Sequence, residues 1–458
     1  MSAHGEEFER LEAAQEHWDG LLEAQELSAA DLAGLSADLA DRGQVVDGRP
    51  LCNVLRPHLL TRGLLERQST AANQVVAAAG KALHALLADE QLSQLHLGRF
   101  SDWIGDVLEM EPRAVGQGSL VRLDAALART RLHFVEINAD TPLGAGHNDA
   151  IADFFCGLDV FEEFSQRYEA TPMRMEPAML ETALSVWRRW GGAGKPKVTI
   201  VRHIAPELIA SSARVDVENY RRHGLEAELC DAADLSFDGR RLLSPSGPVD
   251  LVHRIVPIAA CLAAPDVTRP LIEAERAGAV CMLNPFRSEL LGHKTLFALI
   301  SDPDQDFGLT AAERRAVREH VPWGRPLRDG DTTDASGKTV DLVAHVLKNR
   351  ERLVVKPAHS YGGLDVQLGW RQDQSQWENT ISDALEGDFV VQQRVELHRR
   401  SYPTLDAADR RQEFFEDTDP FLFEGRLGGM LSRLSPGEIT NVHAGGGVVP
   451  TFVVEPRA

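Results

Sequence analysis

The sequence predicts an α/β protein, of α+β type with several subdomains, on three observations. Its 458 residues are enough for about two or three domains with a substantial core. Residues 6–95 repeat Leu, Ala and Glu at three- and four-residue spacing, which is typical of helices. Residues 198–256 alternate short apolar runs with a helical pattern, which favours a mostly parallel sheet.

Changes of pattern divide the chain into four expected regions. They are a mainly helical region 1–100, a strand-like region 101–155, a parallel α/β layer 156–300 and a last α/β part 301–458. A helix is expected at 211–223, and strands are expected at 121–125, 132–137, 198–201, 227–230, 250–256, 353–357 and 389–395. The charged stretch 302–340 is interpreted as a linker or mobile lid, and the stretches 359–363 and 400–418 are candidate lids.

Composition excludes some classes of partner. The formal net charge is −21, from 48 basic and 69 acidic side chains, so a nucleic-acid-binding surface is not expected. No apolar run approaches membrane-spanning length, and the acidic N-terminus does not resemble a signal peptide. The five cysteines form no Cys-x-x-Cys pair, which is typical of reduced thiols. We therefore expect a cytoplasmic protein without a membrane partner.

The first candidate site lies on the two strands at 121–125 and 132–137. Side chains alternate along a strand, so Glu136 and Asn138 share one face, as do Arg122 and Asp124. Oxygen ligands suit Mg²⁺, and an arginine beside them suits a phosphoryl group in transfer. The alternative is an ordinary polar face of an antiparallel strand pair.

The second candidate site follows the apolar strand at 353–357. Lys356 ends this strand, and the loop after it is 358–363, which contains Ser360, Tyr361, Gly362 and Gly363. A lysine followed by glycines is suited to nucleotide phosphates, because glycines let backbone N–H groups approach an anion. A simple hairpin turn is the alternative. The spacing is not that of a Walker P-loop.

Several other polar residues are ambiguous. His253 and Arg254 lie near a strand end in the predicted parallel sheet, where they either contact a carboxylate substrate or line the fold. Arg426 and Arg433 either face phosphates or substrate, or lie on the surface. The cluster 147–149 looks like a metal site, but we interpret it as a cap of the following helix.

In their order along the chain, these motifs resemble the synthetase domain of glutathionylspermidine synthase, and more broadly the circularly permuted ATP-grasp proteins. The resemblance rests on four short motifs over residues 100–450. They are Arg122-x-Asp124, Glu136-x-Asn138-Ala139-Asp140, Lys294 in Gly292-His293-Lys294-Thr295-Leu296-Phe297-Ala298-Leu299, and Val355-Lys356-Pro357. As in that family, the expected metal-binding strands precede the nucleotide-binding lysines. The amidase domain of the synthase has no counterpart here, so its substrates, glutathione and spermidine, are not carried over.

The resemblance implies a circularly permuted ATP-grasp fold, with a pre-ATP-grasp-like parallel layer, and a role for each matching residue. Asp124, Glu136 and Asn138 match Mg²⁺ ligands, with two ions expected, and Arg122 matches the catalytic arginine. The residues expected around ATP are Lys294, Lys356, Ser360, Tyr361, Gly362, Gly363, Gln392 and Gln393. The residues proposed for substrate are His253, Arg254 and Arg433.

The activity implied by the resemblance is an ATP-dependent carboxylate–amine ligase that works through an acyl phosphate. Its partners would then be a small-molecule carboxylate and an amine, and a homodimer is the default assembly. Two alternatives remain: a phosphotransferase that releases its phosphorylated product, and a catalytically silent nucleotide-binding partner of another enzyme. The complete set of motif residues argues against the silent protein.

Overall fold

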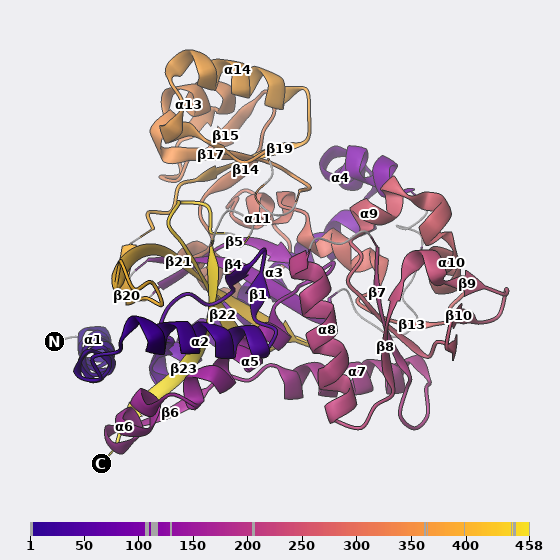
Figure 1. Ribbon diagram of the computed structural model, residues 1–458. Coiled ribbons are helices and arrows are strands. Elements are labelled where there is room, and N and C mark those ends of the chain that lie inside the picture. Colours follow the sequence, from indigo (N-terminus) through magenta and orange to yellow (C-terminus); the bar gives the residue numbers. More distant parts are fainter. Residues whose placement is uncertain are drawn as a thin grey trace.

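A computed structural model of the chain describes residues 3–105, 110, 118–128, 131–203, 207–360, 363, 365–397, 399–440, 442 and 446–457. Three sheets and the helices around them make up most of this part (Figure 1). No helix among the described residues is both long and apolar enough to cross a membrane. All five cysteines are free thiols.

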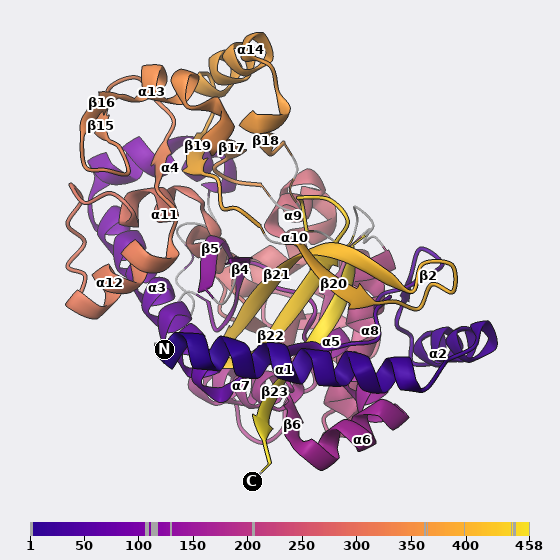
Figure 2. The ribbon, with the colours of Figure 1, turned by 90° about the vertical axis from the view of Figure 1, so that its left-hand side faces the viewer.

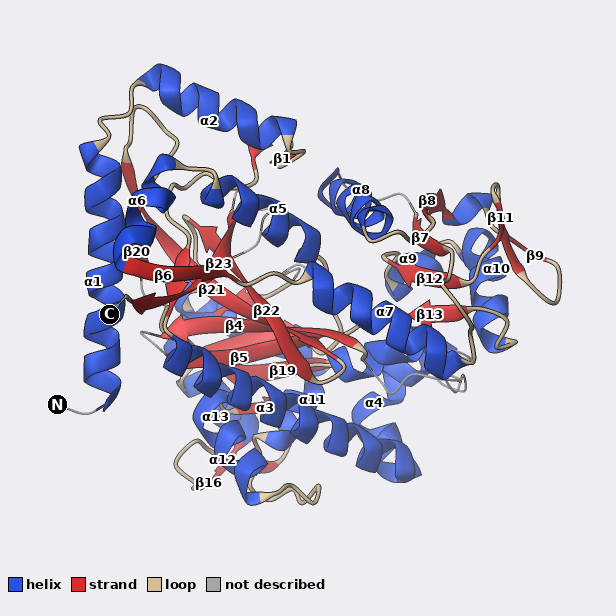
Figure 3. Ribbon diagram, turned by 90° about the horizontal axis from the view of Figure 1, so that it is seen from below, coloured by secondary structure: helices blue, strands red, loops and turns tan. Residues whose placement is uncertain are grey.

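The largest sheet has eight strands and joins distant parts of the chain (Figure 3). Its order is β3 (His58–Leu60), β23 (Gly447–Pro456), β22 (Arg426–Ser435), β21 (Arg411–Phe423), β4 (Leu120–Ala128) and β5 (Arg131–Asn138), with β20 (Arg399–Pro403) beside β21 and β6 (Tyr168–Pro172) beside β23. Only the β3–β23 pair is parallel among the described pairs of this sheet. The expected strands at 121–125 and 132–137 are therefore confirmed as neighbours.

The N-terminal region is helical, as predicted, and packs on the large sheet. Its elements are α1 (Ala3–Ala24), α2 (Ala29–Asp41), α3 (Arg62–Ala88), α4 (Glu90–Ile104) and the short hairpin β1 (Val45–Val46) and β2 (Arg49–Pro50). Helix α3 buries ten residues at three- and four-residue spacing, most of them Leu, Ala or Val. It contacts β5, β22 and β23, while α1 runs across the lower front in Figure 2.

The second sheet is the parallel α/β layer that the sequence predicts. Its order is β13 (Cys281–Leu283), β12 (Leu251–Arg254), β7 (Val198–Arg202) and β8 (Ala227–Asp231). The helices of this part of the chain are α5 (Ala145–Cys156), α6 (Asp159–Arg167), α7 (Glu176–Trp190), α8 (Glu207–Arg222), α9 (Ile258–Ala263) and α10 (Pro265–Arg276). Three short strands, β9 (Ser236–Phe237), β10 (Leu242–Ser244) and β11 (Gly247–Pro248), form a separate small sheet.

The third sheet is antiparallel and lies at the top of Figure 1. Its order is β14 (Gly324–Pro326), β19 (Phe389–Gln393), β17 (Leu353–Pro357) and β18 (Gln367–Leu368). The helices of this region are α11 (Thr295–Ile300), α12 (Ala311–His320), α13 (Leu342–Lys348) and α14 (Gln374–Leu385), with the hairpin β15 (Asp331–Thr333) and β16 (Thr339–Asp341). Among the fully described elements, 3₁₀ turns lie at Ala232–Asp234, Phe286–Gly292, Arg350–Arg352 and Gly369–Arg371.

Two of the stretches interpreted as a linker or lid are instead regular structure. Residues 302–340 contain α12, β14, β15 and β16, and Thr310 and Glu313 form a capping box at the start of α12. Residues 400–418 cover most of β20 and the first half of β21, which is a central strand of the large sheet. Most charged side chains of 302–340 are exposed, as their sequence suggested, but a few are buried and paired. Arg325 pairs with Asp302, and Glu416 pairs with His58 and Arg400.

Candidate functional site

The β4–β5 hairpin brings the first candidate residues together. Arg122 lies opposite Asn138 in the strand register, and Asp124 lies opposite Glu136. All four side chains line one cavity. The alternation of side chains along two adjacent strands therefore creates the cluster that the sequence predicts.

Asp124 is the electrostatic centre of this cluster. Its carboxylate accepts hydrogen bonds from Arg122 Nε at 2.7 Å, Arg433 Nη2 at 2.8 Å and Asn138 Nδ2 at 2.7 Å. Burial alone would raise the pKa of Asp124, but Arg122 and Arg433 outweigh it and hold that pKa well below its ordinary value. Asp124 is therefore a fixed negative charge between two guanidinium groups.

Two buried acids on β21 extend the cluster. Arg433 lies 2.7 Å from Asp417 Oδ2 and 2.9 Å from Asp419 Oδ2. Burial raises the pKa of Asp417 to about 6 and the pKa of Asp419 well above its ordinary value, with Arg433 opposing both shifts. Sequence reasoning missed Asp419, although the alternation of acids at 417 and 419 is the pattern of one strand face.

Lys294 stands just before α11, where it reaches across to β5 and the loop after β17. Its Nζ donates to the carbonyl oxygen of Ser360 at 2.6 Å and lies 3.4 Å from Glu136 Oε2. The backbone N–H of Lys294 also donates to the carbonyl of Ala358. Lys294 therefore ties Glu136 to the loop that the sequence assigned to phosphates.

Lys356 ends β17 and is buried. Its Nζ donates to Gln392 Oε1 at 2.7 Å on the neighbouring strand β19 and to the carbonyl of Val135 at 3.4 Å. Burial, together with the charge of Lys294, lowers the pKa of Lys356 to about 8 against the opposing effect of Glu136. A buried lysine with few neutralising partners is a suitable place for an anion.

The first cavity, of about 490 Å³, lies between the third sheet and the β4–β5 hairpin. Its polar lining includes Asp124, Glu136, Lys356, Gln392 and Gln393, and Gly363 also borders it. Apolar side chains from β17, β18 and β21 and from the segment after β19 complete the wall; they are Val354, Val366, Leu368, Val395, Leu397 and Phe415. Tyr361 and Gly362 lie outside the described residues.

A polar clamp borders the first cavity and links the third sheet to the loop after β22. Glu438 accepts hydrogen bonds from Trp370 Nε1 at 3.0 Å, Arg371 Nε at 2.9 Å and Arg394 Nη2 at 3.2 Å. The guanidinium of Arg394 also lies 4.1 Å from the centre of the Trp370 ring. Burial raises the pKa of Glu438, but these donors outweigh it and lower that pKa.

The second cavity, of about 240 Å³, adjoins the first cavity. Arg122, Asn138 and Arg433 line both cavities. Lys294 and Ser360 line the second cavity, so the two expected nucleotide-binding lysines face different cavities. Two arginines, Arg122 and Arg433, therefore stand where the two cavities meet, and both are paired with buried acids.

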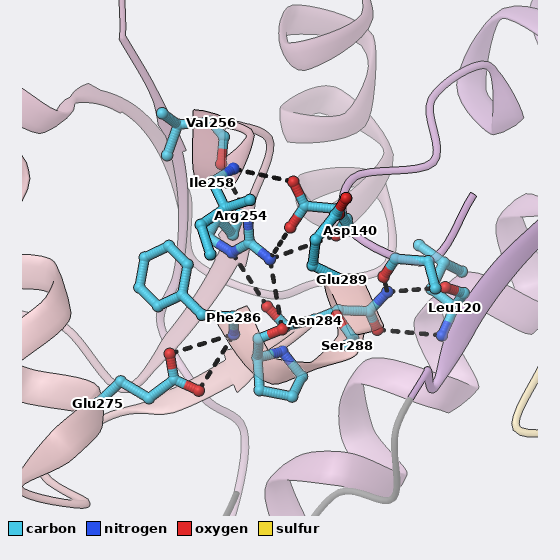
Figure 4. A network of polar contacts seen from close by, with 12 residues as sticks. Leu120, Asp140, Arg254, Val256, Ile258, Glu275, Asn284, Phe286, Ser288 and Glu289 are labelled. Carbon is cyan, nitrogen blue, oxygen red and sulfur yellow. Dashed lines mark hydrogen bonds and ion pairs between the residues drawn. The ribbon is translucent and has the colours of Figure 1, made fainter. Parts of the chain in front are cut away.

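His253 and Arg254 are placed inside the parallel layer. Figure 4 shows Arg254 in a network with Asp140, Glu275 and Asn284 nearby. Arg254 pairs with Asp140 and donates to the backbone carbonyls of Val256, Asn284 and Pro285. Neither His253 nor Arg254 lines the two cavities, so the proposed substrate contact is not seen and both side chains support the fold.

Arg254 acts on the second cavity through Asp140. The Asp140 carboxylate pairs with Arg254 and accepts a hydrogen bond from the N–H of Ile258 at 2.9 Å. Asn284 holds the neighbouring backbone, since its Nδ2 donates to the carbonyls of Leu120 and Ala139 (Figure 4). This network joins the parallel layer to the ends of β4 and β5.

Asp149 caps a helix, as we expected of this cluster, but the helix is a different one. It lies within α5 and accepts hydrogen bonds from the N–H groups of Met175 and Glu176, both at 2.9 Å. Those groups start α7 rather than α5. The nearby His147 bonds Gln44, so the cluster 147–149 is accounted for by structural contacts.

The donor set on β4 and β5 fits a magnesium ion shared with a ligand. Among the described residues, no group of three or more His, Cys, Asp or Glu is placed to hold a metal. Asp124, Glu136 and Asn138 offer two carboxylates and an amide, and Mg²⁺ usually takes one or two carboxylates together with substrate phosphates and water. The residues therefore suit an ion brought in with a nucleotide.

Comparison with known proteins gives the fold. No family model matches the sequence, and a search of curated proteins finds no match. Among solved structures, a glutathione synthetase-like effector from Globodera pallida in the apo form matches with a TM-score of 0.57 and 12% identity, over 92% of this chain and 96% of that chain.

A second structure, described as a putative gamma-glutamylcysteine synthetase from Methylobacillus flagellatus KT, matches at a TM-score of 0.40 and 11% identity, over 84% of this chain and 87% of that chain. At this TM-score the match is too weak to support a statement about the fold. The mixed α/β fold of this chain is thus shared, over nearly its whole length, with a glutathione synthetase-like protein.

Proposed function

We propose that this chain is an ATP-dependent carboxylate–amine ligase with a circularly permuted ATP-grasp fold. The observation that carries the proposal is the pair of adjoining cavities that share Arg122, Asn138 and Arg433. One cavity suits a nucleotide and the other suits a second substrate, so a group transferred between them would pass the shared arginines. The fold shared with a glutathione synthetase-like protein agrees with this activity.

In the proposed reaction, ATP lies in the first cavity with its phosphates toward Lys356. A carboxylate oxygen of the second substrate attacks the γ-phosphorus, and the bond from that phosphorus to the bridging oxygen breaks and releases ADP. An amine then attacks the acyl carbon, phosphate leaves, and the nitrogen loses a proton. The phosphoryl step needs positioning and charge neutralisation more than covalent help.

The chain's own cations would do most of this work. Arg122 stands at the contact between the cavities, where negative charge passes from one ligand to the other, and Asp124 holds its guanidinium in place. Lys294, on the side of the second cavity, would keep the carboxylate beside the phosphoryl group. Asp124, Glu136 and Asn138 would hold Mg²⁺, expected as two ions, which neutralises phosphate charge.

The test is Mg²⁺-dependent ADP release from the purified protein with pools of carboxylates and amines. Glu136→Gln and Arg122→Met should each lower the rate by ~10²–10³-fold, while exposed Glu226→Gln should leave it unchanged. Release that needs both an acid and an amine supports the ligase. Release with acid alone and a stable phosphorylated product would favour a phosphotransferase, and failure to bind ATP would overturn the site.

A further inference from the structure

The lining of the second cavity indicates which kind of acid it takes. Most of the lining surface is apolar. The main apolar contributors are Leu51, Leu143, Ile209, Ile258, Leu431 and Val448. These side chains come from six separate parts of the chain, so the apolar character belongs to the whole wall and not to one patch.

The acidic groups of the lining already have partners. Asp140 is engaged by Arg254 and by the Ile258 N–H, and Glu289 lies 2.5 Å from His359 Nε2. A ligand ammonium group would therefore compete with contacts that the protein already makes. This lining does not favour a substrate that carries a positive charge.

The cationic end of the cavity, in contrast, has donors to offer. Arg122 has five N–H donors, and the described contacts use three of them: two bind Asp124 and one binds the carbonyl of Leu143. Lys294 adds an ammonium group at the same end of the site as Glu136. One carboxylate is thus well placed beside the first cavity. The other arginine of the lining, Arg433, already pairs with Asp124, Asp417 and Asp419.

Polar side chains also contribute to the wall, among them Thr141, His147 and Ser212. Ser212, on α8, is 1% exposed and lines the cavity, and its hydroxyl has no hydrogen-bond partner among the described residues. A buried hydroxyl without a partner costs free energy unless a ligand or water satisfies it. Ser212 therefore offers a neutral hydrogen bond to a ligand.

The volume of the second cavity limits the size of the ligand. The cavity measures about 240 Å³. An apolar cavity of about 150 Å³ is known to hold benzene. The second cavity thus has room for a body of about one ring or a short branched chain in addition to a carboxylate, but not for a peptide of several residues.

We propose that the acid substrate is a compact monocarboxylate with a mainly apolar body, in which a neutral hydrogen-bonding group can face Ser212. This inference rests on the proposed ligase function, since it assumes that the second cavity holds the acid to be phosphorylated. The carboxylate binds Arg122 and Lys294, the body lies against the apolar wall, and Ser212 bonds the neutral polar group.

The experiment uses hydroxylamine as a general amine, so the natural amine is not needed. Its nitrogen attacks the acyl phosphate, phosphate leaves, and the resulting hydroxamate is measured by its colour with ferric iron. Two sets of acids are compared. Pentanoate and glutarate differ by a second carboxylate, and the series from benzoate to 5-phenylpentanoate varies the length of the apolar body. Pentanoate should exceed glutarate by ~100-fold or more in kcat/KM, since the second charge would lie against the mainly apolar wall.

Two variants test whether the acid lies in this cavity. Ile209→Ala enlarges the second cavity and should lengthen the preferred acid by one or two carbons. Ile258→Ala, on α9, removes a side chain from another part of the wall and should have the same effect. Ile272→Ala on α10, which does not line the cavity, is the matched control. Ser212→Ala should lower kcat/KM about tenfold for the best hydroxylated isomer of pentanoate and leave pentanoate unchanged.

The outcomes separate the two proposals. If no acid yields hydroxamate and ADP, the ligase function itself is wrong. If glutarate or a dipeptide reacts as well as pentanoate, the ligase stands and the monocarboxylate inference is overturned. If apolar acids react but both cavity variants keep the parent length profile, the acid lies elsewhere and the inference is also overturned.

Discussion

At the scale of single residues, Arg433 is the side chain on which the centre of the site depends. It is buried and pairs with three carboxylates, those of Asp124, Asp417 and Asp419. Burial alone would lower its pKa, but these acids outweigh that effect and raise it well above the ordinary value. The arginine is therefore both a lining residue of two cavities and the counterion of a buried acidic group.

Replacing Arg433 should be far more damaging than replacing an exposed arginine of the same strand. Arg433→Leu leaves buried carboxylates without their counterion and should lower the free energy of unfolding by about 3–5 kcal/mol, measured by urea denaturation. Arg426→Ala, exposed on β22, should change it by no more than about 0.5 kcal/mol. A loss below about 1 kcal/mol for Arg433→Leu would contradict the pairing described here.

Asp216 offers a test of stability against pH. It is buried on α8, its Oδ1 has no hydrogen-bond partner among the described residues, and burial, with help from Glu176 and Asp149, raises its pKa to about 8. The folded state keeps this proton while the unfolded chain releases it near pH ~4. Stability is therefore greatest below about pH 4 for this group and is lost as pH rises toward about 8.

Asp216→Asn removes this titration. Thermal unfolding should show a higher Tm than the parent at about pH 8 and a gap that shrinks steadily toward about pH 5. The exposed Glu218→Gln on the same helix should follow the parent at every pH. Equal pH slopes for the parent and Asp216→Asn would show that Asp216 is ionised in the folded protein.

At the scale of elements, the strands that carry the site could be predicted, and the charged strands could not. Strands β4 and β5 alternate polar and apolar residues, and β17 is mainly a run of apolar residues. Their local sequence pattern was therefore sufficient to predict them. The first half of β21 reads as exposed because it is rich in acids, yet Glu416 is buried against His58 and Arg400. His58 is far away in sequence and Arg400 lies on the neighbouring strand β20, so the local pattern of β21 does not reveal either partner.

The same reason explains Arg254. A strand-end arginine in a parallel sheet suggests a ligand contact, but its acid partner, Asp140, lies more than a hundred positions earlier in the chain. Sequence reasoning found the donors and acceptors but not their pairing. Motif residues on one hairpin, such as Asp124 and Glu136, were found together because the register of adjacent strands brings them together.

The start of α7 depends on a side chain from another helix. Asp149→Ala removes the acceptor of two buried N–H groups and should cost about 1–2 kcal/mol of unfolding free energy. Hydrogen exchange of the Met175 and Glu176 amides should accelerate in the variant. Asp153→Ala, on the same helix with a half-exposed ion pair, should cost less than about 1 kcal/mol and leave those amides unchanged.

At the scale of the whole molecule, the third sheet meets the rest of the protein around the first cavity. The clamp at Glu438 is one link between them, and the bonds of Lys294 and Lys356 are others. A ligand in the cavity would contact the third sheet on one side and the β4–β5 hairpin on the other. Nucleotide binding should therefore stabilise the junction of the two parts.

Hydrogen exchange with a non-hydrolysable ATP analogue and Mg²⁺ tests this arrangement. Exchange should slow in β17 and β19 and also in β4 and β5, because the ligand contacts both walls, while β7 and β8 of the parallel layer should keep their rates. A hundredfold excess over Kd should add about 2.7 kcal/mol to stability. Lys356→Met should abolish both effects, and the control Glu226→Gln should retain them. Protection confined to the third sheet would mean that the nucleotide does not reach the β4–β5 hairpin, and the shared arginines would then lose their proposed role.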